Sequence, residues 1–267
     1  MLYFIKKIFK SAFNRIKLPF SILKTNILSS KSILPFESNL KSASDNGKYP
    51  ELALKAATDP NIFSIFRRHH KYTEILEHVT RNQGDEYLKI IREKYNFKDE
   101  DIFQIISPLM QLGTPKLLKL KSFSKKISTT GLRYLKVALE IKELFGTDIG
   151  NFVEIGCGYG GQAIILDQLL KVNSYTFYDL WQVNLLIKRF IELSSFNSKY
   201  SICTIKEDTF NKRNEWDLCI SNYAFSELPK KLQSLYIDNV LINSKSGYMI
   251  MNSGIEGNYG NIKNFSQ

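Results

Sequence analysis

One short stretch constrains this chain more than any other: residues 151–162 read N-F-V-E-I-G-C-G-Y-G-G-Q. The apolar residues Phe152, Val153 and Ile155 predict a buried strand, and residues 163–170 predict a helix. Between them lie four glycines, Gly156, Gly158, Gly160 and Gly161. Glycines allow a tight turn and let a ligand approach bare backbone, and the first turn of the helix offers unpaired N–H groups. Strand, glycine turn and helix predict the opening of a nucleotide-binding βαβ unit.

Two classes of cofactor fit this turn. Gly156, Gly158 and Gly161 satisfy the G-x-G-x-x-G fingerprint of dinucleotide enzymes. The same stretch also resembles motif I of class I methyltransferases that use S-adenosylmethionine, because Glu154 stands two residues before the first glycine. An acid there suits a ligand with a cationic amino-acid end and would repel a pyrophosphate. A tight turn that binds no ligand is the simplest alternative.

A second acid favours the cofactor site. Residues 175–179, Y-T-F-Y-D, predict the next strand, and Asp179 follows Gly160 by 19 residues. An acid that binds ribose hydroxyls is expected at about this distance from the glycines. The glycine turn and Asp179 together predict a bound nucleoside.

Charge is spread unevenly over the 267 residues, whose net charge is +11. Seven basic residues and no acid lie in residues 1–34. A nucleic-acid-binding protein usually spreads basic charge over a folded face, so we expect no nucleic-acid partner. The three cysteines, Cys157, Cys203 and Cys219, show no C-x-x-C spacing, which favours a reducing compartment without disulfides. Cys157 is interpreted as a small side chain that fills the turn.

The N-terminal segment predicts an amphipathic helix. Its apolar residues share one helical face: Leu2, Ile5, Phe9, Phe13 and Ile16. Such a helix either contacts anionic lipid at the inner face of the membrane or docks on its own protein. Its apolar runs are too short to span a bilayer, and no signal peptide is visible, so the chain is expected to be cytoplasmic. Residues 35–49 have the composition of a linker, which makes 1–49 one region.

Residues 50–148 predict a helical cap over the cofactor domain. Helices are expected at 51–57, 62–68, 72–80, 86–95, 101–106 and 132–145, with starts at Asp59, Thr73, Asp85 and Asp99 and a stop at Gly146. His69, His70 and His78 show no metal-ligand spacing, so no metal site is expected, and His78 is kept as a distant candidate base. The lysine-rich loop 115–126 predicts a solvated face, with a contact for an anionic acceptor or membrane as the alternative.

Residues 149–267 predict the cofactor domain. Further strands are expected at 200–205, 216–222 and 247–252, and helices at 181–193 and 229–242. This alternation predicts an α/β fold with a Rossmann-like, doubly wound, mainly parallel sheet, which binds ligands at the carboxyl ends of its strands.

A family resemblance adds to this interpretation. The strings S-T-T-G-L-R-Y-L-K, V-E-I-G-C-G-Y-G-G-Q, Y-T-F-Y-D-L, S-N-Y-A-F-S-E-L-P and G-Y-M-I-M-N resemble the sugar O-methyltransferases encoded among bacterial surface-polysaccharide genes. The resemblance runs from about the start of the helical region to the end of the chain. It implies methyl transfer from S-adenosylmethionine to a sugar hydroxyl, in the synthesis of a surface polysaccharide or glycolipid.

The fold and the resemblance together assign roles to residues at the strand ends. An acid after the third strand, Asp208, is expected at the adenine amino group, with Thr209 and Phe210 beside the ring. The predicted cofactor-binding residues are Glu154, Gly156, Gly158, Gly160, Gly161, Gln162, Asp179, Leu180, Asp208, Thr209, Phe210 and Ser221.

The acceptor side follows the fourth strand. Asn222, Tyr223 and Ser226 are expected to hold the sugar. A sugar hydroxyl is a poor nucleophile, so a general base should accelerate the reaction by roughly a hundredfold or more. Glu227 is the best-placed candidate base. Its alternative role is that of a carboxylate that favours the N-terminus of the helix following Pro229.

One feature departs from the methyltransferase pattern. Class I methyltransferases close their sheet with two more strands, whereas only fourteen residues follow Ser253, and they predict no strand. We therefore expect the fifth strand to be an apolar open edge. Two other functions stay open: an NAD(P)-dependent oxidoreductase, although no Tyr-x-x-x-Lys set is recognisable, and a truncated, non-catalytic homologue that only binds the cofactor.

Overall fold

A computed structural model describes residues 47–204 and 215–252, all of which belong to one compact unit, Pro35–Gln267. The predicted amphipathic helix, most of the linker, and residues 253–267 lie outside the described residues. Within the described ranges, no helix is long and apolar enough to cross a membrane.

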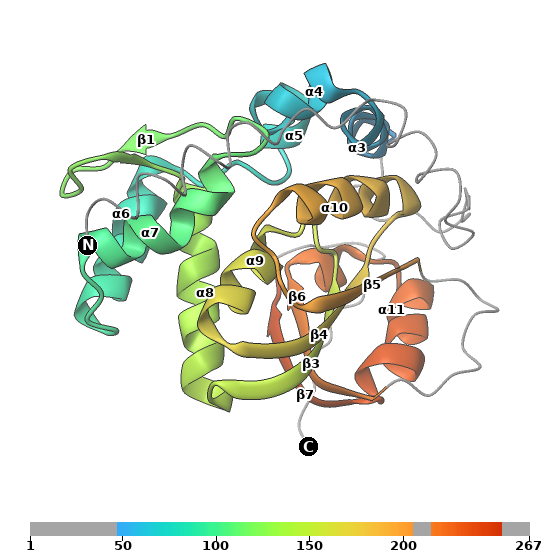
Figure 1. The fold of residues 1–267 in the computed structure, drawn as a ribbon. Helices are drawn as coiled ribbons and strands as arrows, with labels where there is room; N and C mark the ends of the chain where they lie inside the picture. Colours follow the sequence, from blue (N-terminus) through green and yellow to red (C-terminus); the bar gives the residue numbers. More distant parts are fainter. Residues whose placement is uncertain (1–46, 205–214, 253–267) are drawn as a thin grey trace. The chain divides into compact units, whose positions relative to one another are not determined.

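Five parallel strands form the central sheet (Figure 1). In chain order they are β3 Asp148–Ile155, β4 Lys171–Tyr178, β5 Lys199–Cys203, β6 Trp216–Asn222 and β7 Ser244–Ile250. Their spatial order is β5-β4-β3-β6-β7, so the chain runs outward from β3 in one direction and then returns to continue from β3 in the other. This order confirms the predicted Rossmann-like, doubly wound α/β fold. In such sheets ligands bind outside the carboxyl ends of the two strands where the order reverses, which are β3 and β6 here.

Each face of the sheet is buried under helices. Side chains alternate along a strand, so Phe152 and Tyr175 stack on one face while Val153 and Ile155 point to the other. On the first face lie α8 (Thr129–Phe145), α9 (Gly161–Leu169) and α10 (Trp181–Leu193) (Figure 1). The second face forms a core with α11 (Lys230–Tyr236) and the π-helical turn Ile237–Leu241. The helix predicted for 229–242 is thus one continuous helical stretch, whose last turn is π-helical.

The region before α8 is helical, as predicted. Its elements are α3 Lys48–Thr58, α4 Pro60–Ile65, the 3-10 turn Phe66–Arg68, α5 His70–Thr73, α6 Arg81–Glu93 and α7 Asp99–Met110. It packs on the helices of the sheet domain in two places: α3 lies along α10, and α6 and α7 lie against α8. Arg189 of α10 donates hydrogen bonds to the carbonyls of Ala56 and Ala57 at the end of α3, at 3.0 Å each.

Several predicted helix boundaries in this region are wrong. The helix predicted for 72–80 ends at Thr73, because the following turn packs against the glycine loop instead of continuing the helix. Asp85 does not start a helix: Thr80 and Gln83 form a capping box that starts α6 earlier. The start at Asp59 is confirmed by its side chain, which accepts a hydrogen bond from the Asn61 N–H at 2.8 Å.

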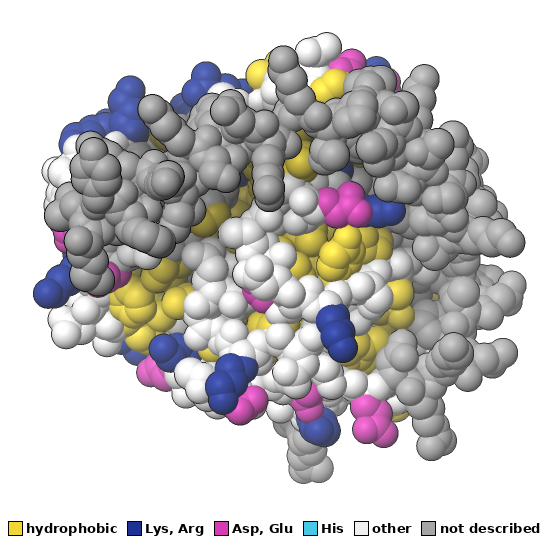
Figure 2. Space-filling model, viewed as in Figure 1, with side chains coloured by type: hydrophobic (Ala, Val, Ile, Leu, Met, Phe, Trp, Pro, Cys, Tyr) yellow, Lys and Arg dark blue, Asp and Glu magenta, His cyan; other side chains and the backbone are white. Residues whose placement is uncertain are grey.

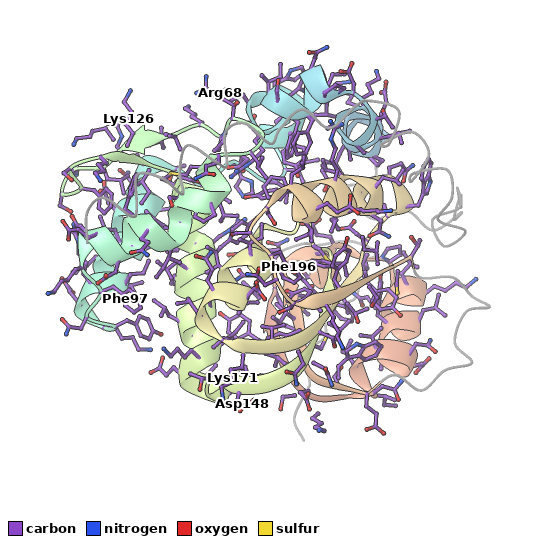
Figure 3. The ribbon with its side chains drawn as sticks, viewed as in Figure 1. Arg68, Phe97, Lys126, Asp148, Lys171 and Phe196 are labelled. Atoms are coloured by element: carbon purple, nitrogen blue, oxygen red, sulfur yellow. The ribbon has the colours of Figure 1, made fainter. Side chains whose placement is uncertain are left out.

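The lysine-rich segment 115–126 is a small hairpin rather than a loop. It pairs β1 (Leu118–Lys119) with β2 (Lys126–Ile127), and its lysines are exposed. Figure 3 shows Lys126 at the upper left with Arg68, where Figure 2 shows a group of basic side chains. Elsewhere on the described part of that face, scattered basic and acidic side chains lie among polar and hydrophobic surface (Figure 2). Exposed lysines on a short hairpin agree with a solvated face.

Candidate functional site

The glycine loop lies between β3 and α9, at the carboxyl edge of the sheet. Gly156 has φ +75, and a Cβ built on it would lie 2.0 Å from the Cβ of Ala224, which follows β6. Gly161 has an ordinary backbone, but a Cβ there would lie 2.6 Å from the Tyr159 ring and 2.7 Å from the Tyr134 ring. The glycines are therefore required by close packing of the loop as well as by its turn.

Asp179 lies at the end of β4 and holds the glycine loop. Its Oδ2 accepts hydrogen bonds from the Cys157 N–H at 2.7 Å and the Gly158 N–H at 3.1 Å, and its Oδ1 accepts one from the Leu180 N–H at 2.8 Å. The carboxylate thus stands over the first turn of the loop, where the sequence predicted an acid for ribose hydroxyls. Leu180, also predicted at the cofactor, precedes α10 as its N-cap.

Glu154 is buried beneath the same loop. Only 2% of the residue is exposed, and its Oε2 accepts a hydrogen bond from the Tyr175 hydroxyl at 2.7 Å. Burial raises the pKa of Glu154 to about 8, and the charge of Asp179 raises it as well, although the Tyr175 hydrogen bond acts in the opposite direction. Two acids therefore share one loop, and a nearby cation would favour their ionised forms.

Cys157 does not have the environment of a nucleophile. Its Sγ lies 3.1 Å from the Glu154 carbonyl oxygen and 3.6 Å from the Tyr178 carbonyl oxygen. Burial raises the pKa of this thiol well above its usual value, so the thiolate is disfavoured. The side chain fills the turn, as predicted.

Two other residues predicted at the cofactor make contacts inside the protein. The Gln162 Nε2 donates to the Tyr134 carbonyl at 3.1 Å, which ties α9 to α8. Ser221 is fully buried, where its hydroxyl donates to the Ile155 carbonyl and accepts from the Phe225 N–H. Ser221 therefore joins the ends of β3 and β6. Asp208, Thr209 and Phe210 lie outside the described residues.

The residues predicted to hold the acceptor follow β6. Tyr223 has φ +72, which is uncommon for a residue with a side chain, and its N–H donates to the Ile250 carbonyl at 2.7 Å. The Ser226 hydroxyl donates to the Tyr223 carbonyl at 2.6 Å. The Oδ1 of Asn222 is buried and accepts no hydrogen bond from the described residues. A ligand that donates a hydrogen bond would satisfy this oxygen.

The two candidate bases differ in their surroundings. Glu227 ends the 3-10 turn Ala224–Glu227, and its Oε1 accepts a hydrogen bond from the Asn252 Nδ2 at 3.0 Å. It precedes Pro229, the N-cap residue of α11, and does not lie in the first turn of that helix. His78 is exposed on the turn between α5 and α6, and partial burial of its ring and the charge of Arg133 lower its pKa.

Several residues that complete this edge were not predicted from the sequence. Leu76 lies 3.1 Å from the position of a Cβ on Gly158 and so covers the loop. Asn184 of α10 donates to the Asp179 and Cys203 carbonyls and to the Thr204 hydroxyl. Arg133 of α8 lies beside the Tyr223 ring. Each is placed by tertiary packing between segments distant in sequence, which no local pattern marks.

The described part of the chain contains no set of side chains that could bind a metal ion. Nowhere in these residues do three His, Cys, Asp or Glu side chains come together in a way that could hold an ion. The three histidines lie on the cap, where His69 and His70 stack on each other with ring centroids 4.6 Å apart.

Comparison with known proteins gives similarity at the level of solved structures only. No family profile matches the sequence, and no curated protein matches it. Three similar structures are an enzyme from Pyrococcus horikoshii provisionally assigned as an RNA methyltransferase (17% identity, TM-score 0.39), one from Methanococcus maripaludis provisionally assigned as an S-adenosylmethionine-dependent methyltransferase (16%, 0.34), and coclaurine N-methyltransferase bound to N-methylheliamine and S-adenosylhomocysteine (13%, 0.37). The matches cover 59%, 66% and 74% of this chain and 74%, 65% and 61% of those chains, respectively.

Proposed function

We propose that the chain is an S-adenosylmethionine-dependent methyltransferase. The observation that carries the proposal is the acidic lining of the glycine loop. Asp179 accepts the N–H groups of Cys157 and Gly158, and Glu154 lies buried beneath them. S-adenosylmethionine brings a sulfonium, an ammonium group and ribose hydroxyls to such a site. Two carboxyl groups are suited to the cations, and Asp179 is suited to the hydroxyls.

A dinucleotide would meet the opposite conditions. Its pyrophosphate needs free N–H groups at the glycine turn and at the start of the helix. Two of those N–H groups already donate to the Asp179 carboxylate. Displacing that carboxylate by a diphosphate would also bring two more negative charges toward Glu154. The loop that formally satisfies the dinucleotide fingerprint therefore favours the other cofactor.

The residues of this chain would act chiefly by positioning. The cofactor would supply an electrophilic methyl group, and the protein would hold the acceptor oxygen in line with it. Such alignment can contribute up to ~7–11 kcal/mol in ideal intramolecular cases. Asp179 would fix the ribose, while the loop, held by Leu76 and Ala224, would fix the amino-acid end.

The acceptor in this proposal is a sugar hydroxyl, as the resemblance implies. Asn222 offers a buried oxygen that lacks a donor among the described residues, and this oxygen suits a hydroxyl. Glu227, oriented by Asn252, and His78, whose lowered pKa favours the neutral imidazole, are the two candidate proton acceptors. Glu227→Gln and His78→Gln would distinguish them, because removal of the true base should lower kcat more than KM.

Calorimetric titration with S-adenosylhomocysteine and with NADH tests the cofactor. We expect the wild type to bind S-adenosylhomocysteine only. Asp179→Asn keeps the shape of the side chain but removes its charge, and it should weaken binding at least tenfold. Asp217→Asn is the matched control: this acid accepts from the Asn151 N–H and pairs with Lys245 at the opposite edge of the sheet, so affinity should not change. Binding of NADH alone, or equal affinity in the Asp179 variant, would refute the proposal.

A further inference from the structure

Arg133 stands apart among the buried charged residues of this chain. It lies in the second turn of α8 and is 8% exposed. Its guanidinium lies 5.4 Å from the centre of the Tyr134 ring and 5.9 Å from that of the Tyr223 ring. Within the part of the chain that the structure describes, it donates no hydrogen bond and forms no ion pair.

The other two buried arginines show what a buried guanidinium usually obtains. Arg67 pairs with Glu77 and donates to the carbonyls of Leu109 and Leu112. Arg189 donates to two carbonyls at the end of α3 and lies over the Phe63 ring. A guanidinium carries five N–H donors. No nitrogen of Arg133 is among the fully buried side-chain atoms that lack a partner, so its donors keep some exposed surface and are open to a ligand. Two aromatic rings lie beside this guanidinium.

The place of Arg133 is the ligand edge of the sheet. The next residue, Tyr134, accepts a hydrogen bond from Gln162 at the start of α9, and Tyr223 follows β6. His78, on the turn that covers the glycine loop, is close enough for the charge of Arg133 to lower its pKa. Arg133 therefore lies between the predicted cofactor loop and the predicted acceptor residues.

Among the described residues, no acid forms an ion pair with this cation. Its charge acts on the pKa of His78, Tyr87 and Tyr134. The nearest acid further along the same helix face is Glu140, which pairs with Lys136 at 2.7 Å and accepts a hydrogen bond from the Tyr248 hydroxyl. An unpaired cation that faces a ligand edge is suited to an anionic group of the ligand.

We propose that Arg133 binds a carboxylate of a ligand at this edge. The planar guanidinium can donate two parallel hydrogen bonds to a carboxylate, and the two tyrosine rings hold it in place. The inference rests on the proposed methyltransferase function, which offers two sources of the carboxylate. One is the amino-acid end of the cofactor, and the other is an acidic sugar such as a uronic acid.

Calorimetry with two adenosine ligands tests the first source. S-adenosylhomocysteine carries the carboxylate, whereas 5′-methylthioadenosine lacks the whole amino-acid end. If the cofactor supplies the carboxylate, Arg133→Met should weaken S-adenosylhomocysteine binding at least tenfold and leave methylthioadenosine unchanged. Arg133→Lys should be intermediate, because a point charge replaces the fork. Lys136→Met, one turn along the same helix, is the matched control and should change neither affinity.

Titration with D-glucuronate tests the second source. If the acceptor supplies the carboxylate, wild-type protein loaded with S-adenosylhomocysteine should bind D-glucuronate, and Arg133→Met should not. D-glucose lacks the carboxylate, so its affinity should be the same for both proteins. Thermal melting of each variant shows whether it is folded.

The outcomes separate the two proposals. If a folded Arg133→Met variant bound S-adenosylhomocysteine and D-glucuronate as the wild type does, the carboxylate site would be overturned. The methyltransferase proposal would stay intact. If the wild type bound neither adenosine ligand, the methyltransferase proposal would fail, and D-glucuronate binding to wild type but not to Arg133→Met would then support the carboxylate site by itself.

Discussion

The two edges of the central sheet are built on different principles. At the amino edge, charges are paired and at least partly exposed: Asp148 with Lys171 at 3.1 Å, and Asp217 with Lys245 at 2.7 Å. Figure 3 shows Asp148 and Lys171 together at the lower end of β3 and β4. At the carboxyl edge, Glu154 is buried with a raised pKa, and Arg133, which is 8% exposed, has no anionic partner among the described residues.

This difference indicates where the chain accepts a cost in stability. Exposed pairs at the amino edge contribute little and could be replaced by many other residues. Buried charges at the carboxyl edge destabilise the free protein unless a ligand offsets them. Such groups cluster at functional sites, so the contrast itself favours the carboxyl edge as the place of function.

Gly156→Ala should produce the largest loss of stability. A positive φ costs a residue with a Cβ about 1–2 kcal/mol, and the clash at 2.0 Å with the Ala224 Cβ adds about 1–3 kcal/mol. The free energy of unfolding, measured in urea, should therefore fall by roughly 2–5 kcal/mol, and S-adenosylhomocysteine binding should be lost with it.

Two other glycines separate the causes. Gly146 has φ +84 and ψ −165, a conformation almost exclusive to glycine, with open space around it, so Gly146→Ala should cost only the conformational part, about 1–3 kcal/mol. Gly247 lies in β7, where a Cβ would meet only a carbonyl oxygen at 3.9 Å, so Gly247→Ala should be nearly neutral. Equal losses in all three variants would contradict the role of Ala224. Adding Ala224→Gly to Gly156→Ala should restore the part caused by the clash.

Glu154→Gln should change how stability depends on pH. The folded protein holds the Glu154 proton up to a pKa of about 8, whereas an unfolded chain releases it near 4.5. Between these values the folded state binds more protons, so wild-type stability should fall as pH rises, by up to ~5 kcal/mol from this group. Glutamine does not titrate and can still accept the Tyr175 hydrogen bond. The variant should match the wild type near pH 5 and exceed it above pH 8.

Tyr175→Phe tests the same acid in another way: it keeps the Glu154 carboxyl group and removes the hydroxyl that donates to it. The Tyr175 hydroxyl lowers the pKa of Glu154, so its removal should raise that pKa further and extend the loss of stability to higher pH. Urea unfolding at several pH values measures all three slopes. Parallel slopes in wild type and Glu154→Gln would mean that Glu154 is ionised throughout, and the picture of a buried, protonated acid would be wrong.

Local sequence patterns predicted the sheet domain well. The predicted and observed bounds of β6 and α10 coincide. A single apolar run specifies β6, and the helical spacing of apolar residues specifies α10, so each can be recognised from its own residues. The cap was predicted less well. Its turn after Thr73 depends on Leu76 reaching the glycine loop, and a contact between distant segments leaves no periodic pattern.

The candidate site shows the same division. The glycines and Asp179 follow from a local motif, and the structure brings them together as hydrogen-bonded neighbours. Ser221 was predicted to face a ligand because it ends a strand, whereas its hydroxyl is used inside the fold. Arg133 was missed because its significance depends on the lack of an anionic partner among the described residues. Such partners come from segments distant in sequence, so no local pattern shows whether one is present.

Lys171→Met should have the smallest effect, and it tests the amino edge. Its ion pair with Asp148 is 75% and 70% exposed, so removing it should change the free energy of unfolding by less than about 0.5 kcal/mol. S-adenosylhomocysteine affinity should be unchanged, because the pair lies at the opposite end of β3 and β4 from the glycine loop. A tenfold loss of affinity in this variant would show that the amino edge affects the site through those two strands. The contrast between a tolerant edge and a functional edge would then have to be abandoned, since β3 and β4 would transmit changes from one edge to the other.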